Sequence, residues 1–155
     1  MVTRKTPKAS SPHGTQTWLA VVRAYNLCDS IMTARLAELG LRIGEHEVLA
    51  TLATVPGITQ QALAARCFVA KSGVSMLLTQ MEGKGWVLRE ADASDARVKR
   101  LLLTKAGLAL AAKTLKIQSE VIGAMVEGAS DEQLSFVTDV MEQVSLRLEA
   151  IRAAG

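Results

Sequence analysis

The sequence predicts a mainly α-helical protein with one small β hairpin, and three observations lead to this fold class. The 155 residues are 49% hydrophobic but only 3% aromatic, and many of them are Ala and Leu, which favour helices over strands. Apolar residues recur three and four positions apart along most of the chain. Residues 86–103 instead contain two short apolar runs on either side of a charged loop. A chain of this length is expected to form one domain.

The N-terminal third is predicted to hold a polar tail and two helices. Residues 1–14 are rich in Ser, Thr, Pro and Lys, so we expect a disordered tail followed by a single domain over 15–155. A first long helix is predicted from about residue 16 to 39, with Gly40 placed to end it. A shorter helix over 45–53 ends before Pro56 and Gly57.

Two short helical patterns lie close together between Thr59 and Val87, which is the arrangement of a helix-turn-helix. Thr59 is predicted to cap the first helix. The second helix begins near Lys71 and buries one face. Its opposite face carries Lys71, Ser72, Ser75, Met76, Thr79 and Gln80. Such a face suits the major groove of DNA, although similar helix pairs occur in domains that bind no nucleic acid.

The two short apolar runs after the helix-turn-helix predict a β hairpin, with residues 90–98 as its polar tip. A hairpin in this place is called a wing, and its tip can reach a minor groove. Six basic residues against three acidic ones lie between Lys84 and Lys105. This concentration of positive charge predicts contact with a phosphate backbone, and Arg89 and Lys99 are among the candidate DNA contacts.

Two further helices are predicted at the C-terminal end. Thr104 is expected to cap the first, and Ser130 with Gln133 has the spacing of a capping box that opens the second. The last helix repeats apolar residues as a heptad seam: Leu134, Val137, Met141, Val144, Leu148 and Ile151. The seam either packs on this chain's own helices or forms a two-fold dimer, and a dimer matches two DNA half-sites.

Composition excludes several classes of protein. We find no apolar run long enough for a membrane span and no secretory pattern, so we expect a cytoplasmic protein with no membrane partner. Neither Cys28 nor Cys67 has CxxC spacing, and both are interpreted as small buried residues, with oxidant sensing through Cys28 as the alternative. His46 stands between two glutamates, but too few ligands accompany it for zinc. No cofactor, metal or catalytic motif is predicted.

The order of these parts, from about Trp18 to Ile151, resembles the MarR (multiple-antibiotic-resistance regulator) family of winged-helix transcription factors. The most specific signature of that family is matched by Asp95-Ala96-Arg97 followed by Leu103-Thr104-Lys105-Ala106-Gly107. Residues 60–64, 71–75, 83–87 and Arg89 also fall where the family pattern places them.

The resemblance implies a winged helix-turn-helix lobe over about 44–103 and dimerisation helices over about 16–39 and 104–152. It implies that Arg97 enters the minor groove and that Asp95 positions it by pairing with Arg89 or Arg97. The family often has an Arg after the recognition-helix Ser, whereas this chain has Met76. Base reading then depends on Ser72, Ser75, Thr79 and Gln80, with Met76 against a thymine methyl.

The resemblance also implies a homodimeric repressor that binds a pseudo-palindromic duplex and is released by a small phenolic or aromatic anion. Candidates for the ligand pocket are Trp18, Tyr25, Met32 and His46, each of which can equally be an ordinary core residue. The alternative function is a winged-helix module that docks a protein partner.

Overall fold

The computed structural model describes residues 12–67 and 71–155. It is mainly helical with one two-stranded antiparallel sheet, as the sequence predicts. The chain divides into two compact units, Met1–Gln118 and Ser119–Gly155. In order along the chain the elements are α1 (Pro12–Ala37), α2 (Ile43–Thr54), α3 (Gln60–Arg66), α4 (Lys71–Gly83), β1 (Val87–Ala91), β2 (Lys99–Leu103), α5 (Lys105–Val126) and α6 (Asp131–Ala154). Within the described ranges, none of these helices has the length and apolar character that a membrane span requires.

Helix α1 begins at Pro12, earlier than the predicted start near residue 16. Proline is favoured in the first turn because its missing amide has no helical partner there and its φ angle is already helical. Residues 12–14, which the sequence assigned to a disordered tail, are therefore helical. The rest of that predicted tail, residues 1–11, lies outside the described residues.

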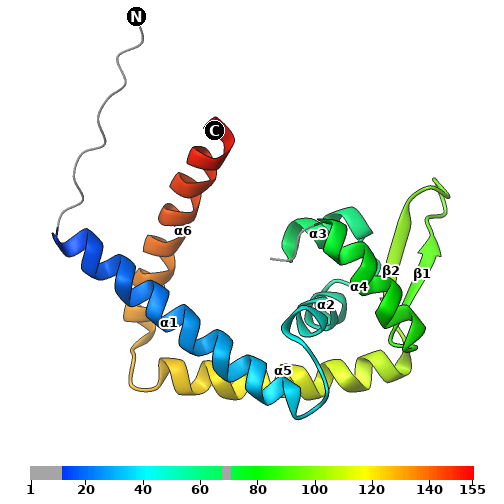
Figure 1. The fold of residues 1–155 in the computed structure, drawn as a ribbon, viewed down its shortest axis with the longest axis horizontal. Helices are drawn as coiled ribbons and strands as arrows, with labels where there is room; N and C mark the ends of the chain where they lie inside the picture. The colour runs from blue at the N-terminus through cyan, green and yellow to red at the C-terminus, as the bar shows by residue number, and fades with distance from the viewer. Residues whose placement is uncertain (1–11, 68–70) are drawn as a thin grey trace, which may run out of the picture. The chain divides into compact units, whose positions relative to one another are not determined.

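Helix α2 lies at the centre of the first unit, where it contacts α1, α4 and β2 (Figure 1). Its predicted inner residues Val48, Leu49 and Leu52 are all buried. Leu36 and Leu41, at the end of α1 and just after it, are buried as well. This apolar core supplies a rigid support for the short helices α3 and α4.

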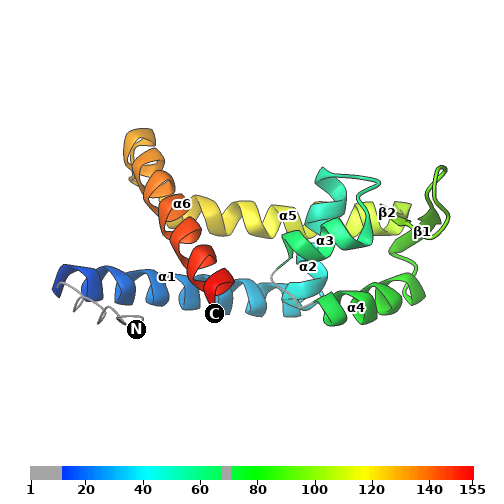
Figure 2. The same cartoon turned by 90° about the horizontal axis from the view of Figure 1, so that it is seen from above.

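Helices α3 and α4 form the predicted helix-turn-helix. The Thr59 hydroxyl accepts a hydrogen bond from the Ala62 amide at 3.1 Å, which confirms the predicted cap of α3. Helix α4 buries Val74, Leu78 and Met81 on one face. It leads through a tight turn directly into β1 (Figure 2). Gly85 has a φ of 74° in this turn, a conformation that favours glycine.

The hairpin pairs Val87 with Leu103 and Ala91 with Lys99. A third segment joins it, which the sequence did not predict. Gly57 donates its amide to the Leu101 carbonyl at 2.9 Å, and Leu101 donates to the Ile58 carbonyl at 3.0 Å. The hairpin is thereby attached to the loop between α2 and α3, so the wing and the helix-turn-helix share one scaffold.

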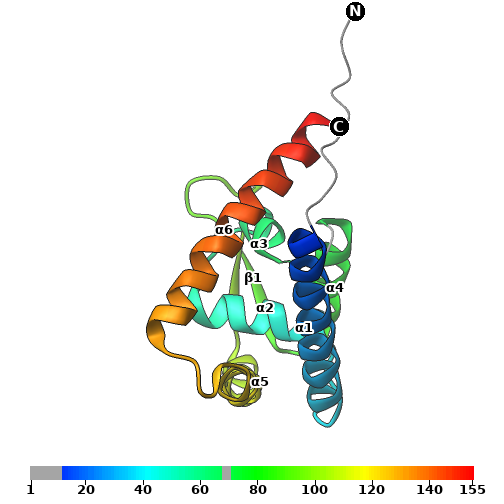
Figure 3. The same ribbon diagram turned by 90° about the vertical axis from the view of Figure 1, so that its left-hand side faces the viewer.

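The two C-terminal helices have the predicted caps. The Thr104 hydroxyl accepts the Gly107 amide at 3.0 Å at the start of α5. Ser130 and Gln133 form the capping box of α6, each side chain bonding the other residue's amide. Helix α6 is one uninterrupted helix (Figure 3), and none of its residues is buried.

Candidate nucleic-acid interface

The outward face of α4 carries four of the side chains predicted to contact DNA. Ser75, Met76, Thr79 and Gln80 are all exposed, opposite the buried Val74 and Leu78. Met76 is 66% exposed. Helix α4 begins at Lys71 as predicted, but the side chains of Lys71 and Ser72 lie outside the described part of the chain. The polar and apolar faces of α4 thus agree with the expected recognition helix.

Arg89 of β1 binds α4 within the chain. Its Nη2 donates to the Ser75 carbonyl at 3.0 Å and to the Thr79 hydroxyl at 3.1 Å. Its Nε lies 3.7 Å from a carboxylate oxygen of Glu82. The same Thr79 hydroxyl donates to the Ser75 carbonyl at 3.0 Å. Arg89 thereby fixes the wing strand against the recognition helix. The predicted alternative, that Arg89 pairs with Asp95, is not what the structure shows, because Asp95 pairs with Arg97.

The start of α2 holds the other side of α4 through two polar contacts. Arg42 Nη2 donates to Gln80 Oε1 at 3.0 Å. Glu45 is buried and accepts both the Arg42 amide at 2.9 Å and Lys84 Nζ at 2.6 Å. Burial alone would raise the pKa of Glu45, but these bonds and the nearby cations outweigh it and lower the pKa. Lys84 also lies 4.5 Å from the centre of the Trp86 ring, a cation–π contact.

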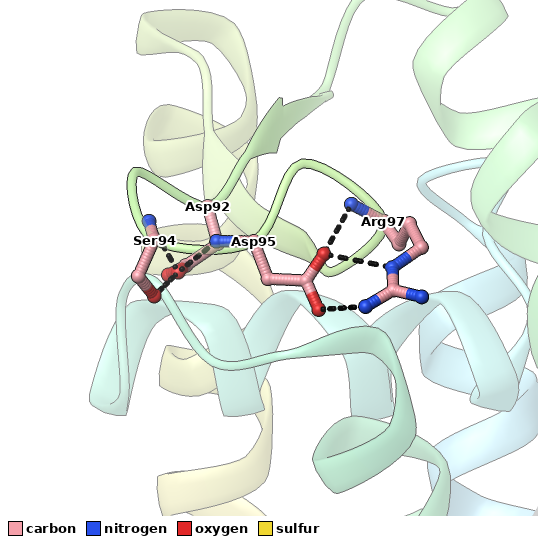
Figure 4. Close-up of polar contacts among 4 residues, drawn as sticks. All are labelled: Asp92, Ser94, Asp95 and Arg97. Carbon is pink, nitrogen blue, oxygen red and sulfur yellow. Dashed lines mark hydrogen bonds and ion pairs between the residues drawn. The ribbon is translucent and has the colours of Figure 1, made fainter.

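The wing tip is organised by Asp92 (Figure 4). Its Oδ2 accepts the amides of Ser94 at 3.0 Å and Asp95 at 3.3 Å, and also the Ser94 hydroxyl. Its Oδ1 accepts Arg100 Nε from β2. These bonds, led by those from Ser94 and Arg100, hold the pKa of Asp92 far below its usual range. Arg100 also donates to the Gly57 carbonyl at 2.9 Å, which links the tip to the α2–α3 loop.

Asp95 pairs with Arg97 of the same loop, one of the two partners considered for it. One carboxylate oxygen accepts the Arg97 amide at 3.0 Å and Nε at 3.1 Å, and the other accepts Nη2 at 3.2 Å (Figure 4). These hydrogen bonds lower the pKa of Asp95. The Arg97 side chain is still 92% exposed. The pair therefore orients the guanidinium without removing it from solvent.

A groove of about 520 Å³ lies between the wing and the start of α3. It is lined by Thr59, Gln60, Gln61, Ala64, Arg97, Val98 and Lys99. Arg97 and Lys99 supply positive charge to this lining, and Gln60 and Gln61 carry side-chain amides that can donate hydrogen bonds. This arrangement suits an anionic backbone running between the wing and α3.

The four candidates for a ligand pocket fall into two classes. Trp18 and Tyr25 are 62% and 64% exposed on α1, whereas Met32 near the end of α1 and His46 in α2 are buried. Trp18, Tyr25 and Met32 are seven residues apart, which puts them on one face of α1. Burial lowers the pKa of His46, whose Nδ1 has no hydrogen-bond partner. None of these four residues lines the groove between the wing and α3.

Both cysteines are free thiols and half-buried. Burial, with Glu47 nearby, raises the pKa of Cys67, which disfavours a reactive thiolate. No group of three or more His, Cys, Asp or Glu side chains in residues 12–67 and 71–155 is arranged to hold a metal ion. Glu45, which flanks His46, instead binds Lys84.

Several residues that organise this interface were not predicted from the sequence: Arg42, Glu45, Lys84, Asp92 and Arg100. Arg42 and Glu45 contact partners 38 and 39 positions away in the chain. No local spacing indicates such contacts. Asp92 had a usable signal, because Asp followed two residues later by a Ser amide is a common side-chain turn.

Comparisons with known proteins agree with this geometry. A protein-family model described as the MarR family matches residues 39–98, which span α2, α3, α4, β1 and the wing loop up to β2. The transcriptional regulator HosA of Escherichia coli O157:H7 is 30% identical over 105 residues, which are 65% of this chain and 76% of HosA.

Two solved structures are similar in fold. One is a MarR-family regulator from Listeria monocytogenes complexed with a 26mer DNA, with a TM-score of 0.77 and 18% identity over 84% of this chain and 87% of that one. The other is the organohalide-sensing regulator RdhR-CbdbA1625 bound to 2,4-dichlorophenol, with a TM-score of 0.72 and 18% identity over 95% and 89%. Helix-turn-helix, wing, family model and relatives agree: the chain belongs to the MarR family of DNA-binding transcriptional regulators, which are not enzymes.

Proposed function

We propose that this regulator is a homodimeric repressor that binds a pseudo-palindromic operator and leaves it when a small phenolic or aromatic anion binds. The observation that carries the DNA-binding part is the exposed Arg97, oriented by Asp95 on a wing that Arg89 attaches to α4. Arg97 is then available to a narrow minor groove, while α4 enters the major groove. The Listeria regulator, solved with DNA, supports this interpretation.

The dimer is supported by apolar surface on the terminal helices. Large hydrophobic side chains remain exposed along three of them: Trp18, Leu19, Val21, Val22, Tyr25, Leu27 and Ile31 on α1; Leu108, Ile122 and Met125 on α5; and Phe136, Val137, Val140, Leu146, Leu148 and Ile151 on α6. Exposed apolar surface of this extent is unfavourable in water, and a second copy would bury it. The proposed domain division follows: a DNA-binding lobe over about 44–103 and dimerisation helices on either side of it.

The ligand proposal rests on two features. RdhR-CbdbA1625 binds 2,4-dichlorophenol. In this chain Trp18 and Tyr25 are exposed aromatic side chains on the face of α1 that also carries Met32. Covered by a second copy, that face would offer rings for stacking against a phenol. The fourth candidate, His46 of α2, is buried.

The test of DNA binding uses Arg97→Ala against Lys116→Ala, which removes the same charge from an exposed position of α5. In titrations over a range of salt, Arg97→Ala should weaken duplex binding and reduce the salt slope by about 1 per protomer, whereas the control should bind as wild type does. Equal affinity for Arg97→Ala and wild type would contradict the wing assignment.

The test of the dimer uses Leu148→Asp on the α6 seam and Gln143→Asp off it. Light scattering should give twice 16.5 kDa for wild type and the control, and a lower mass for Leu148→Asp.

The test of ligand control titrates 2,4-dichlorophenol and benzoate into the DNA complex. Release of duplex by neither compound, together with an unchanged tryptophan fluorescence, would oppose ligand control by this class.

A further inference from the structure

The outward face of α4 presents a large apolar side chain to solvent. Met76 is 66% exposed in the middle of the recognition helix. An exposed methionine there has no structural role in the core, which Val74, Leu78 and Met81 fill from the opposite face. Its thioether chain is flexible and apolar, so it gains free energy from any apolar group that covers it.

Two polar neighbours of Met76, Thr79 and Gln80, already form side-chain hydrogen bonds within the protein. Gln80 would read adenine by accepting from N6 and donating to N7 at once. Its Oε1 already accepts Arg42 Nη2 at 3.0 Å, so one of the two lone pairs of this oxygen is taken. The Thr79 hydroxyl accepts Arg89 at 3.1 Å and donates to the Ser75 carbonyl. Both side chains are thus engaged in positioning the helix.

We propose that Met76 is a specificity-determining residue that selects thymine in each half-site by packing against the C5 methyl group of the base in the major groove. The methyl is the only apolar group that a base pair of unmodified DNA presents in that groove. The inference rests on the DNA binding proposed above and specifies what α4 reads. The exposed Ser75 hydroxyl lies beside Met76 and supplies a hydrogen-bonding group next to the apolar contact.

The test begins with selection of duplexes by the full-length protein from a library with a random core. The best duplex is then resynthesised with deoxyuridine in place of single thymines, which removes the methyl group and keeps the base pairing. Wild type should lose about fivefold in affinity at one thymine position per half-site, the size expected for one buried methyl contact. Met76→Ala should bind the thymine duplex about fivefold more weakly and be insensitive to the same replacement.

Uracil also alters the flexibility of DNA slightly. The decisive quantity is therefore the loss of affinity on replacing one thymine, compared between wild type and Met76→Ala at the same position. Met76→Leu retains an apolar side chain and should keep most of the sensitivity, and far-UV circular dichroism checks that each variant is folded. The proposal is overturned if no replacement affects wild type, or if Met76→Ala stays as sensitive as wild type. Neither result affects the DNA-binding proposal, which would instead fail if selection enriched no duplex at all.

Discussion

Replacing Gly107 with alanine should destabilise the protein strongly, although alanine is the better helix former. A Cβ added at Gly107 would lie 2.1 Å from the Trp86 carbonyl oxygen, 3.0 Å from its carbon and 3.3 Å from Leu103 Cδ2. Such atoms do not approach closer than about 3 Å, so α5 must move by about 1 Å. The close approach explains why glycine ends the Leu-Thr-x-x-Gly signature at this position.

The movement disrupts a small hydrogen-bond cluster at the start of α5. The Thr104 amide donates to the Trp86 carbonyl at 3.0 Å, and the Gly107 amide donates to the Thr104 hydroxyl at 3.0 Å. Losing both costs about 2 kcal/mol, and overpacking adds about 1–3 kcal/mol. Alanine recovers about 1 kcal/mol of helix propensity. The unfolding free energy should therefore fall by about 2–4 kcal/mol.

Urea unfolding followed by circular dichroism measures this change, with every variant at one protein concentration because association adds to apparent stability. Gly123→Ala is the matched control in the same helix, since an added Cβ there meets nothing within 4 Å. It should stabilise by up to about 1 kcal/mol. If Gly107→Ala were as stable as wild type, the close packing of α5 on the Trp86 carbonyl would be refuted.

Three further predictions concern charged groups. Lys84→Met leaves the buried Glu45 carboxylate without its cation and should lower the unfolding free energy by about 2 kcal/mol. The double variant Glu45→Gln with Lys84→Met should recover part of this loss. If the single and the double variant were equally stable, the pairing would be contradicted. Burial lowers the pKa of His46 from 6.5, so the unfolded chain takes up the proton first and the unfolding free energy should fall below about pH 6.5 by at most about 1.4 kcal/mol per pH unit. In urea titrations at several pH values, the unfolding free energy of His46→Phe should no longer depend on pH in this range. If the pH dependence were unchanged, a group other than His46 would be its cause. Asp92→Ala should speed hydrogen exchange of the Ser94 and Asp95 amides, which donate to the Asp92 carboxylate. Asp92→Asn should retain slower exchange, because its side-chain oxygen can still accept hydrogen bonds from these amides. If exchange were unchanged in both variants, the Asp92 turn would be excluded.

Features that depend on neighbours in sequence were predictable. Thr59 and Ser130 were recognised as caps because a cap needs only a hydroxyl and an amide three residues later. The buried face of α4 followed from the spacing of Val74 and Leu78 in the same way. The polar composition of residues 12–14 favours a tail, but Pro12 suits the first turn of a helix, so α1 begins earlier than predicted.

Contacts between distant segments were not predictable, because they depend on how the helices pack. The sequence offered Arg89 as a candidate DNA contact, yet its guanidinium binds the Ser75 carbonyl and the Thr79 hydroxyl. It gave no sign that Gly57 would extend the hairpin. His46 stands between two glutamates, but one of them, Glu45, is neutralised by Lys84, which follows the end of α4.

The engaged cations change how the electrostatics of the wing should be understood. Of the six basic residues between Lys84 and Lys105, three act within the protein: Lys84 binds Glu45, Arg89 binds α4, and Arg100 binds Asp92 and the Gly57 carbonyl. A count of charges in the sequence therefore overstates the number available to phosphates. Arg97 also pairs with Asp95, but its side chain stays 92% exposed. Together with the exposed Lys99 and Lys105 it should neutralise about three phosphates per protomer, so this segment should contribute a salt slope near −2.7, about half of what six cations would give. The other three cations act inside the protein: Arg89 and Lys84 hold α4 in place, and Arg100 holds the wing tip to the α2–α3 loop. The wing therefore orients α4 as well as offering a contact to DNA.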